Sequence, residues 1–498
     1  MIDQTANIRK NAQYIFVQKM TVPVINLLVT IYIVKKLSIS DYGIYNLLLA
    51  IIGYLTLFSS MGMLNVFQRY IPEYNTNEEY YILKKLFRSG MILRFILTSL
   101  CLIILLLFKD QINNLFKVDN FHHYIEFFTI GILLFLEIQI VELTLSSLLL
   151  NKYILFSYMI SAVVRAIMIY IFLEQGLGIK GLLLAETINY AILLSLQLFF
   201  YYTGFARLNT SPKKPFPIRR LLYYGGFSYL DEVGETILDV KTDFFIISAF
   251  LGPTMVGLYA FANQIIELVS KILPFRFLKS LIRPVFFSSF TKNQDMEHLN
   301  YNFNFLIKII AFIAMPTFIC LYMFSDKIIL YFFDEKYMPA LKVLIVFTTF
   351  MIINSFQFPL QLVVQAKEKV QITFSSKIFS IYNLIGDILI INYLGILGVG
   401  IVTCSARLFQ NIFIYYRIKK YVPLKFEFSP LKKILVNSLL TAICVYFFRN
   451  FATDIYTLIA LIVLSILIYL AISFFNKSFL TEERALINKM LPKPIFQF

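Results

Sequence analysis

The 498-residue chain contains no tryptophan, three histidines and four cysteines. The cysteines lie far apart inside apolar segments without the spacing of metal ligands, so we expect packing residues and no metal site. The histidines, His122, His123 and His298, fall in predicted loops, which leaves no intramembrane histidine for acid–base chemistry. No glycine-rich phosphate loop is present either. The sequence therefore argues against an enzyme and against a bound cofactor.

Charge is also scarce, because only 15% of residues are charged and 59% are hydrophobic, with a mean hydropathy of +0.74. Residues 455–475 form an apolar run without a single charge, which is long enough to cross a bilayer as a helix. A membrane barrel would instead show shorter alternating segments. The sequence predicts an all-α polytopic membrane protein with about 14 transmembrane helices. Four of these spans matter below: 225–251, 256–282, 371–392 and 396–418.

The chain is basic, with 45 Lys and Arg against 29 Asp and Glu. If the N-terminus lies inside, most of these cations fall in inner loops and tails, as the positive-inside rule requires. We therefore expect both termini in the cytoplasm, with the first apolar run retained as a helix. Anionic lipids of the inner leaflet explain the net charge of +16 without a nucleic-acid partner.

The proline-rich loop 204–220 divides the chain into two halves that resemble each other. A shift of 214 residues aligns Gly43 with Gly257 and Tyr45 with Tyr259. Spans one to six then repeat as seven to twelve, related by a pseudo-twofold axis along the membrane normal. We expect an N-terminal lobe at 1–203, a cytoplasmic linker at 204–220, a C-terminal lobe at 221–420 and two additional spans with a cytoplasmic tail at 421–498.

The stretch Gly225–Gly252 reads as one apolar helix that carries an acidic stripe. Four of its carboxylates recur every four residues, which places them along one side of a helix. Charges near the bilayer centre are costly, so the stripe should face a watery cavity or partners inside a bundle. Its members are Asp231, Glu235, Asp239 and Asp243.

Several motifs resemble the polysaccharide-export flippases of the multidrug/oligosaccharidyl-lipid/polysaccharide exporter superfamily. They are LSISDYGIYNLLL followed by QRYIPEY in the first half, and TDFFIISAFLGPTMVGLYAFANQI followed by RPVFFSSF in the second. GLGIKGLLLAE and YLGILGVGIVT resemble the family's later leucine–glycine turns. One departure is the run 38–40, Ser-Ile-Ser, where the family often has a glycine.

The resemblance implies two six-helix lobes, with two extra C-terminal helices, and alternating access around a central cavity. It also implies transport of an undecaprenyl-pyrophosphate-linked oligosaccharide across the bacterial cytoplasmic (inner) membrane, for O-antigen, capsule or exopolysaccharide assembly. A glycan polymerase and the export machinery would then be partners, beside the lipid bilayer. Same-fold alternatives are a peptidoglycan-precursor flippase and a cation-coupled multidrug exporter. A membrane glycan polymerase or glycosyltransferase is the alternative from a different class.

Several cations within the predicted spans are candidates for binding the lipid-linked pyrophosphate. Arg165 and Arg407 have no carboxylate three or four residues away, and an arginine fork matches phosphate oxygens. Lys241 lies equally deep, whereas Lys271 has Glu267 one turn earlier as a structural partner. Lys19 lies near a predicted inner end, as do Arg94, Lys308 and Lys377, and for these residues we expect snorkelling to the interface rather than binding. The candidates are Arg165, Lys241, Arg407, Lys271 and Lys19.

Two interpretations of the acidic stripe remain open. In one, Asp239 or Asp243 titrates during the cycle and couples transport to a proton or sodium gradient, because neighbouring carboxylates raise each other's proton affinity. In the other, the carboxylates pair with cations of facing helices and hold the lobes in register. Asp231 and Glu232 lie near the inner end of this span, where contact with headgroup water or with the basic loop at Arg219 and Arg220 would explain them.

Overall fold

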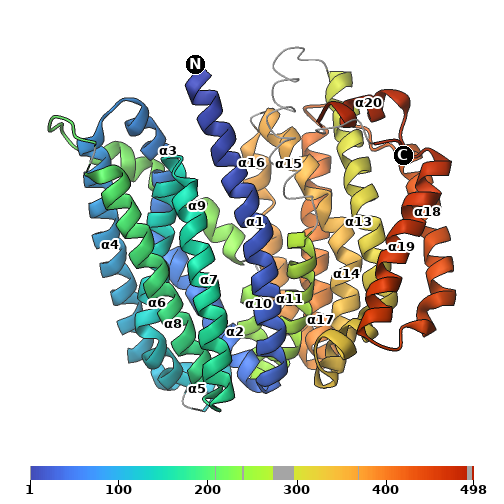
Figure 1. Ribbon diagram of the computed structural model, residues 1–498, viewed down its shortest axis with the longest axis horizontal. Coiled ribbons are helices and arrows are strands. Elements are labelled where there is room, and N and C mark those ends of the chain that lie inside the picture. The colour runs from blue at the N-terminus through green and yellow to red at the C-terminus, as the bar shows by residue number, and fades with distance from the viewer. Residues whose placement is uncertain are drawn as a thin grey trace. The chain divides into compact units, whose positions relative to one another are not determined.

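The computed structural model is all-helical in the residues that it describes, and Figure 1 shows long helices running roughly parallel within each unit. It describes residues 2–119, 121–207, 209–237, 240–272, 296–367, 369–490 and 496–498. The chain divides into two compact units, Met1–Ala260 and Phe261–Phe498. The predicted lobes, divided at the linker 204–220, stay a prediction, because compactness alone does not define a body that moves as one.

Unit 1 is built around α6, α7 and α8, which lie side by side. α1 packs on α7, while α4 and α3 cover α6, and α10 packs on α2 and α5. Its core is made of apolar side chains such as Phe128 and Leu182, both fully buried. The helices are α1 Ile2–Lys36, α2 Ile39–Ser60, α3 Met63–Thr76, α4 Tyr80–Leu107, α5 Lys109–Phe116, α6 Phe121–Ser147, α7 Asn151–Glu174, α8 Gly178–Tyr201, α9 Ile218–Ile237 and α10 Val240–Leu251.

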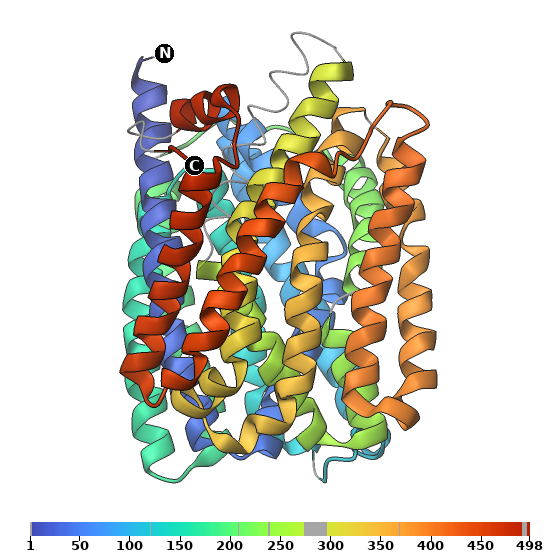
Figure 2. The same ribbon diagram turned by 90° about the vertical axis from the view of Figure 1, so that its right-hand side faces the viewer.

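Unit 2 is organised around α13, against which α14, α18 and α19 pack. Figure 2 shows α18 and α19 beside α13. Fully buried Phe324 and Tyr469 belong to the apolar core of this unit. α11, Pro253–Ile272, begins in unit 1 and ends in unit 2. The remaining helices are α13 Met296–Phe332, α14 Leu341–Ser355, α15 Gln357–Ala366, α16 Val370–Ser375, α17 Ile378–Ile418, α18 Ser429–Phe448, α19 Ile455–Asn476 and α20 Thr481–Met490.

Eleven stretches of the described chain are long and apolar enough to cross a membrane, so the protein is a multi-pass membrane protein. This number is smaller than the predicted number of about 14 spans, and particular segments account for the difference. Gln371–Ile418 counts as one stretch although it contains both predicted spans 371–392 and 396–418, and Gly395 inside it has a non-helical φ of 56°. The predicted span 256–282 runs past Ile272 into residues that are not described.

The second difference concerns the predicted single helix at Gly225–Gly252. α9 ends at Ile237 and α10 begins at Val240, with residues 238 and 239 outside the described chain. The hydroxyl of Thr242 donates to the carbonyl of Thr236 at 3.1 Å. Six residues span about 9 Å along a regular α-helix, so Thr236 and Thr242 do not belong to one continuous helix. Asp243 is therefore not on the same regular stripe as Asp231 and Glu235.

The turns that precede α2 and α11 use different chemistry at equivalent positions, which explains one departure from the family motif. Gly252 has a φ of 82°, a conformation that favours glycine. Ser38, its counterpart by the 214-residue shift, has a φ of −64° and caps α2 by accepting the amide of Asp41 at 3.0 Å. A serine cap needs no left-handed residue, so no glycine is required there.

Candidate functional site

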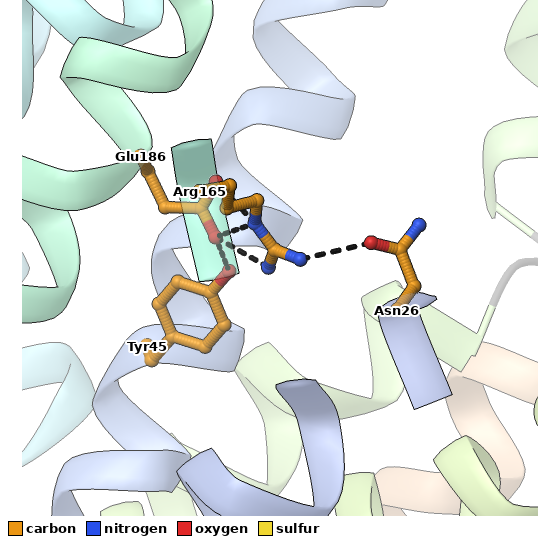
Figure 3. Close-up of polar contacts among 4 residues, drawn as sticks. All are labelled: Asn26, Tyr45, Arg165 and Glu186. Atoms are coloured by element: carbon orange, nitrogen blue, oxygen red, sulfur yellow. Dashed lines mark hydrogen bonds and ion pairs between the residues drawn. The ribbon is translucent and has the colours of Figure 1, made fainter. Parts of the chain in front are cut away.

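Side chains from α1, α2, α7 and α8 of unit 1 come together around Arg165, and Figure 3 shows the four residues concerned. Arg165 on α7 forms an ion pair with Glu186 on α8, with 2.6 Å between Nη2 and Oε1. Its Nε donates to both oxygens of the same carboxylate, at 2.9 and 3.0 Å. Nη1 donates to Asn26 Oδ1 on α1 at 3.0 Å, and the Tyr45 hydroxyl on α2 donates to Glu186 Oε1 at 3.0 Å. The guanidinium therefore links α7 to α1 and α8, and the Glu186 carboxylate extends the link to α2.

The sequence offered Arg165 no local carboxylate, and the fold supplies one from the neighbouring helix. The exposed fraction of the side chain is 2% for Glu186 and 16% for Arg165, so the pair is largely desolvated. Breaking such a pair by removing one partner leaves an uncompensated buried charge, at a cost of about 3–5 kcal/mol. Arg165 and half-buried Asn26 keep partial exposure, so a ligand can reach the cluster from their side.

The other predicted cations lie in different environments. Lys19 is exposed on α1, seven residues before Asn26 and so on the same face, about 10 Å along the helix. Lys241 is exposed near the start of α10, and its aliphatic chain lies against Gly53 of α2. Arg407 is half-buried on α17 of unit 2. The side chain of Lys271 lies outside the described residues.

Of the acidic stripe, the structure describes the side chain of Asp243. It is fully buried on α10, and its Oδ2 accepts the hydroxyl of Tyr259 at 2.6 Å. Tyr259 is the counterpart of Tyr45, whose hydroxyl also donates to a buried carboxylate. The side chains of Asp231 and Glu235, and all of Asp239, lie outside the described residues.

Arg220, at the end of the basic loop 204–220, contacts an acid of α3. Arg220 forms an ion pair with Glu73 on α3, at 2.7 Å. Hydrogen bonding to Glu73 raises the pKa of the Arg220 guanidinium above its usual value. Glu232, the fifth carboxylate of the Gly225–Gly252 stretch, accepts from Asn65 Nδ2 at 2.9 Å. Glu232 thus accepts from the side-chain amide of Asn65 on α3, whereas a basic partner was expected for it.

Sequence reasoning missed a buried charged pair on α4 and α6. The snorkelling expected of Arg94 is wrong, because its side chain is fully buried and its Nη2 donates to Gln139 Oε1 at 2.6 Å. Among the described residues, its Nε and Nη1 have no hydrogen-bond partner, and neither oxygen of buried Glu137 has one. The charges of Arg94 and Glu137 nevertheless act on each other electrostatically. Because the two residues lie 43 positions apart, the sequence does not indicate that they come close together in the fold.

Other buried acids have neutral partners. Glu142 accepts the hydroxyl of Tyr158 at 2.7 Å, and Asp387 accepts from Asn383 at 3.2 Å. The histidines lie at helix starts rather than in the predicted loops. His122, His123 and Glu126 bring possible ligand atoms within 4.8 Å of one another. Asn113 already donates to His122 Nδ1 at 2.8 Å, which commits that nitrogen to the protein.

Comparison with known proteins identifies the family. Residues 34–342 match the family model described as polysaccharide biosynthesis protein. The chain belongs to this family. It is 22% identical over 426 residues to a probable low-salt glycan biosynthesis flippase, Agl15, from Haloferax volcanii, covering 84% of this chain and 85% of that protein. It is 25% identical over 203 residues to the lipopolysaccharide biosynthesis protein WzxC of Escherichia coli K12, covering 40% of each chain. The resemblance found in the sequence is thus confirmed.

Solved structures share the fold of this family member. The lipid II flippase MurJ in an inward closed conformation matches with a TM-score of 0.73 and 17% identity, covering 96% of this chain and 99% of that one. An inward-facing multidrug resistance transporter of the MATE family matches with a TM-score of 0.67 and 15% identity, covering 82% and 98%. The match to the probable glycan biosynthesis flippase Agl15 agrees with the prediction that the protein is not an enzyme.

Proposed function

We propose that this protein is a flippase that moves a polyprenyl-pyrophosphate-linked oligosaccharide from the inner to the outer leaflet of the bacterial cytoplasmic membrane. The supporting observation is the match to a glycan biosynthesis flippase over 84% of this chain. O-antigen, capsule or exopolysaccharide assembly would consume the product, with a glycan polymerase and the export machinery as partners. Alternating access is the expected mechanism, with both termini in the cytoplasm.

The pyrophosphate would contact the predicted cations, beginning with Arg165. Its side chain keeps 16% exposure beside the Glu186 carboxylate, so a phosphate group that approaches it would meet a positive charge already held in one orientation. Lys19, exposed on the Asn26 face of α1, adds a second charge on the same side of that helix. Lys241, Arg407 and Lys271 remain proposed contacts of the same substrate.

Coupling to a proton or sodium gradient is proposed for the acidic residues of α9 and α10 and the segment between them. Asp243 supports this role best, since a fully buried carboxylate that accepts a hydroxyl changes its interactions when it binds a proton or a cation. Asp239, Glu235 and Asp231 keep the same proposed role. Collapse of the imposed gradient in proteoliposomes should slow transport, and an unchanged rate would remove coupling from the proposal.

The test of the function is reconstitution of the full chain with a fluorescently labelled polyprenyl-pyrophosphate oligosaccharide. A membrane-impermeant quencher added outside should reach the label faster in vesicles that contain the protein than in empty vesicles. A labelled peptidoglycan precursor and a cationic dye serve as alternative substrates. Movement of the dye or of the peptidoglycan precursor, with the oligosaccharide left behind, would replace the proposal with the corresponding same-fold alternative.

A further inference from the structure

A basic cavity lies at one end of unit 2, outside the proposed transport site. It has a volume of about 400 Å³ and is lined by residues from the start of α13, the start of α18, the end of α19 and the segment that leads into α20. Three of its lining residues are lysines: Lys308, Lys433 and Lys477. All of the connections around it are ones that the charge distribution places in the cytoplasm, so the cavity lies at the headgroup level of the inner leaflet.

A buried ion pair forms one wall of the cavity and holds α20 in place. Lys308 on α13 donates to Glu483 Oε2 at 2.6 Å, and both side chains are almost fully buried. The same oxygen accepts the backbone amide of Leu480 at 2.7 Å. The snorkelling expected of Lys308 is therefore wrong, since its charge is neutralised by a residue 175 positions further along the chain. With this pair neutralised, Lys433 and Lys477 outweigh the one other acid of the lining, Glu427, whose Oε1 accepts from Asn300 Nδ2 at 3.5 Å.

Those two lysines present donors to the open side of the cavity. Lys433 Nζ donates to the carbonyl oxygens of Asn476 and Lys477, at 3.2 and 3.1 Å. The third proton of its ammonium group is then available to a ligand. The Lys477 ammonium has no ion-pair or hydrogen-bond partner in the described part of the chain. α18 begins beside them at Ser429, but Pro430 has no amide hydrogen and the Leu431 amide donates to the Phe428 carbonyl at 3.0 Å, so the two lysines are the donors. The arrangement suits an anion with several oxygens.

The surface next to Lys433 is apolar and distinguishes a lipid from a free anion. Val436, Leu440 and Ile443 follow Lys433 on the same face of α18, and each is about half exposed. An acyl chain can lie along this face while the headgroup phosphate contacts Lys433 and Lys477. We propose that the cavity binds the phosphate headgroup of an anionic phospholipid of the inner leaflet. Basic pockets between helix ends on the cytoplasmic side are known to recognise such headgroups.

The test is a lipid titration of the purified full chain, followed by native mass spectrometry, with phosphatidylglycerol and phosphatidylcholine as probes. The test variant is Lys433→Gln/Lys477→Asn. Asparagine is chosen because Lys477 has a φ of 46°, which asparagine tolerates. The matched control, Lys419→Gln/Lys420→Gln, removes two exposed lysines that directly follow α17 and do not line the cavity. Equal thermal unfolding midpoints establish that both variants fold.

The test variant should bind phosphatidylglycerol about 30-fold more weakly, because each lysine near a phosphate contributes about a factor of five. The control should bind like the unmodified protein, and phosphatidylcholine should bind weakly to all three. Equal weakening by the two variants would show that the lipid is attracted by exposed lysines in general and not by the cavity. That result would overturn the site. Displacement of the lipid by millimolar inorganic phosphate would identify a free-anion site instead. Because no glycan is present, either outcome is independent of the proposed transport activity.

Discussion

Gly43 and Gly257 pack against each other backbone to backbone, at the starts of α2 and α11. A Cβ added at Gly43 would lie 2.9 Å from the backbone nitrogen of Gly257 and would clash with the carbonyl oxygen of Pro253. A Cβ added at Gly257 would clash in the same way with the carbonyl oxygen of Ile39. Ile39 and Pro253 are themselves related by the 214-residue shift. This reciprocal contact is the one that a twofold axis between the two segments would produce.

Alanine at Gly43 or Gly257 should therefore lower the free energy of unfolding by about 1–3 kcal/mol, because neither contacting group is a side chain that can rotate away. Thermal unfolding of the purified protein measures the change. The control is Gly226→Ala on α9, where an added Cβ meets nothing within 4 Å. That substitution should stabilise the helix by about 0.5–1 kcal/mol. Equal midpoints for all three variants would contradict the close contact.

Arg165 is expected to serve both stability and substrate binding, and a double variant separates the two. Arg165→Gln alone leaves the Glu186 charge buried and should cost about 3–5 kcal/mol of unfolding free energy. Arg165→Gln/Glu186→Gln removes both charges, so most of that stability should return while oligosaccharide flipping stays low. Asp326→Asn/Arg449→Gln, which removes an ion pair in unit 2, is the control. Flipping at the normal rate by the folded double variant would assign Arg165 a structural role alone.

Asp243→Asn is expected to abolish the response of the transport rate to an imposed ion gradient. The amide oxygen can still accept the Tyr259 hydroxyl, so the fold should survive while the titratable group is lost. Rates in proteoliposomes with and without the gradient provide the measurement. Tyr259→Phe removes the hydrogen bond but keeps the carboxylate, and its rate should still respond. A response in Asp243→Asn equal to that of the unmodified protein would leave Asp243 a purely structural acid.

Arg94 and Glu137 should show strong energetic coupling. Arg94→Met alone leaves the Glu137 carboxylate buried without a compensating charge, so unfolding should require about 3–5 kcal/mol less. Arg94→Met/Glu137→Met replaces both by apolar side chains and should be close to the unmodified protein. A double-mutant cycle of unfolding free energies measures the coupling. Additive effects of the two single variants would show that these charges do not act on each other.

Asp454, the N-cap of α19 outside the membrane, predicts that the stability of the fold depends on pH. Asp454 Oδ1 accepts the amides of Thr457 and Tyr456, at 3.0 and 2.7 Å, and these hydrogen bonds lower the pKa of the carboxyl. A carboxyl whose pKa is lower in the folded state stabilises the fold above its unfolded pKa of about 3.9, and this contribution is lost as the pH falls through the folded value. Unfolding midpoints of the protein and of Asp454→Asn should differ in pH dependence below about pH 4. Parallel curves would contradict the prediction.

Much of the fold could be predicted from the sequence, because hydropathy reports a local property. The spans either side of Gly395 were located separately, and the non-helical φ of that glycine marks the division between them. The same reasoning failed at 225–251, where the apolar run concealed the separation of α9 from α10. A hydropathy window averages over residues, so it does not detect that one helix ends and another begins when the composition stays apolar.

The candidate site was only partly predictable. The sequence identified Arg165 and Asp243 as charges too deep for solvent, since the cost of placing a charge in a bilayer depends on the residue itself. It could not identify Glu186, Tyr259 or Asn26 as their partners, because those contacts are made by side chains on other helices. Snorkelling was assigned to Arg94 and Lys308 from their distance to a helix end, whereas packing buries both.

By itself, then, the sequence determined the membrane class, the family and the list of charges that need an explanation. These follow from composition and from short motifs, which act locally along the chain. Only the tertiary structure decided that Arg165 is tied to Glu186, that Lys308 is neutralised by Glu483 and that Gly43 meets Gly257. Such pairings depend on which helix faces pack together, and that is settled by the packing of the whole unit.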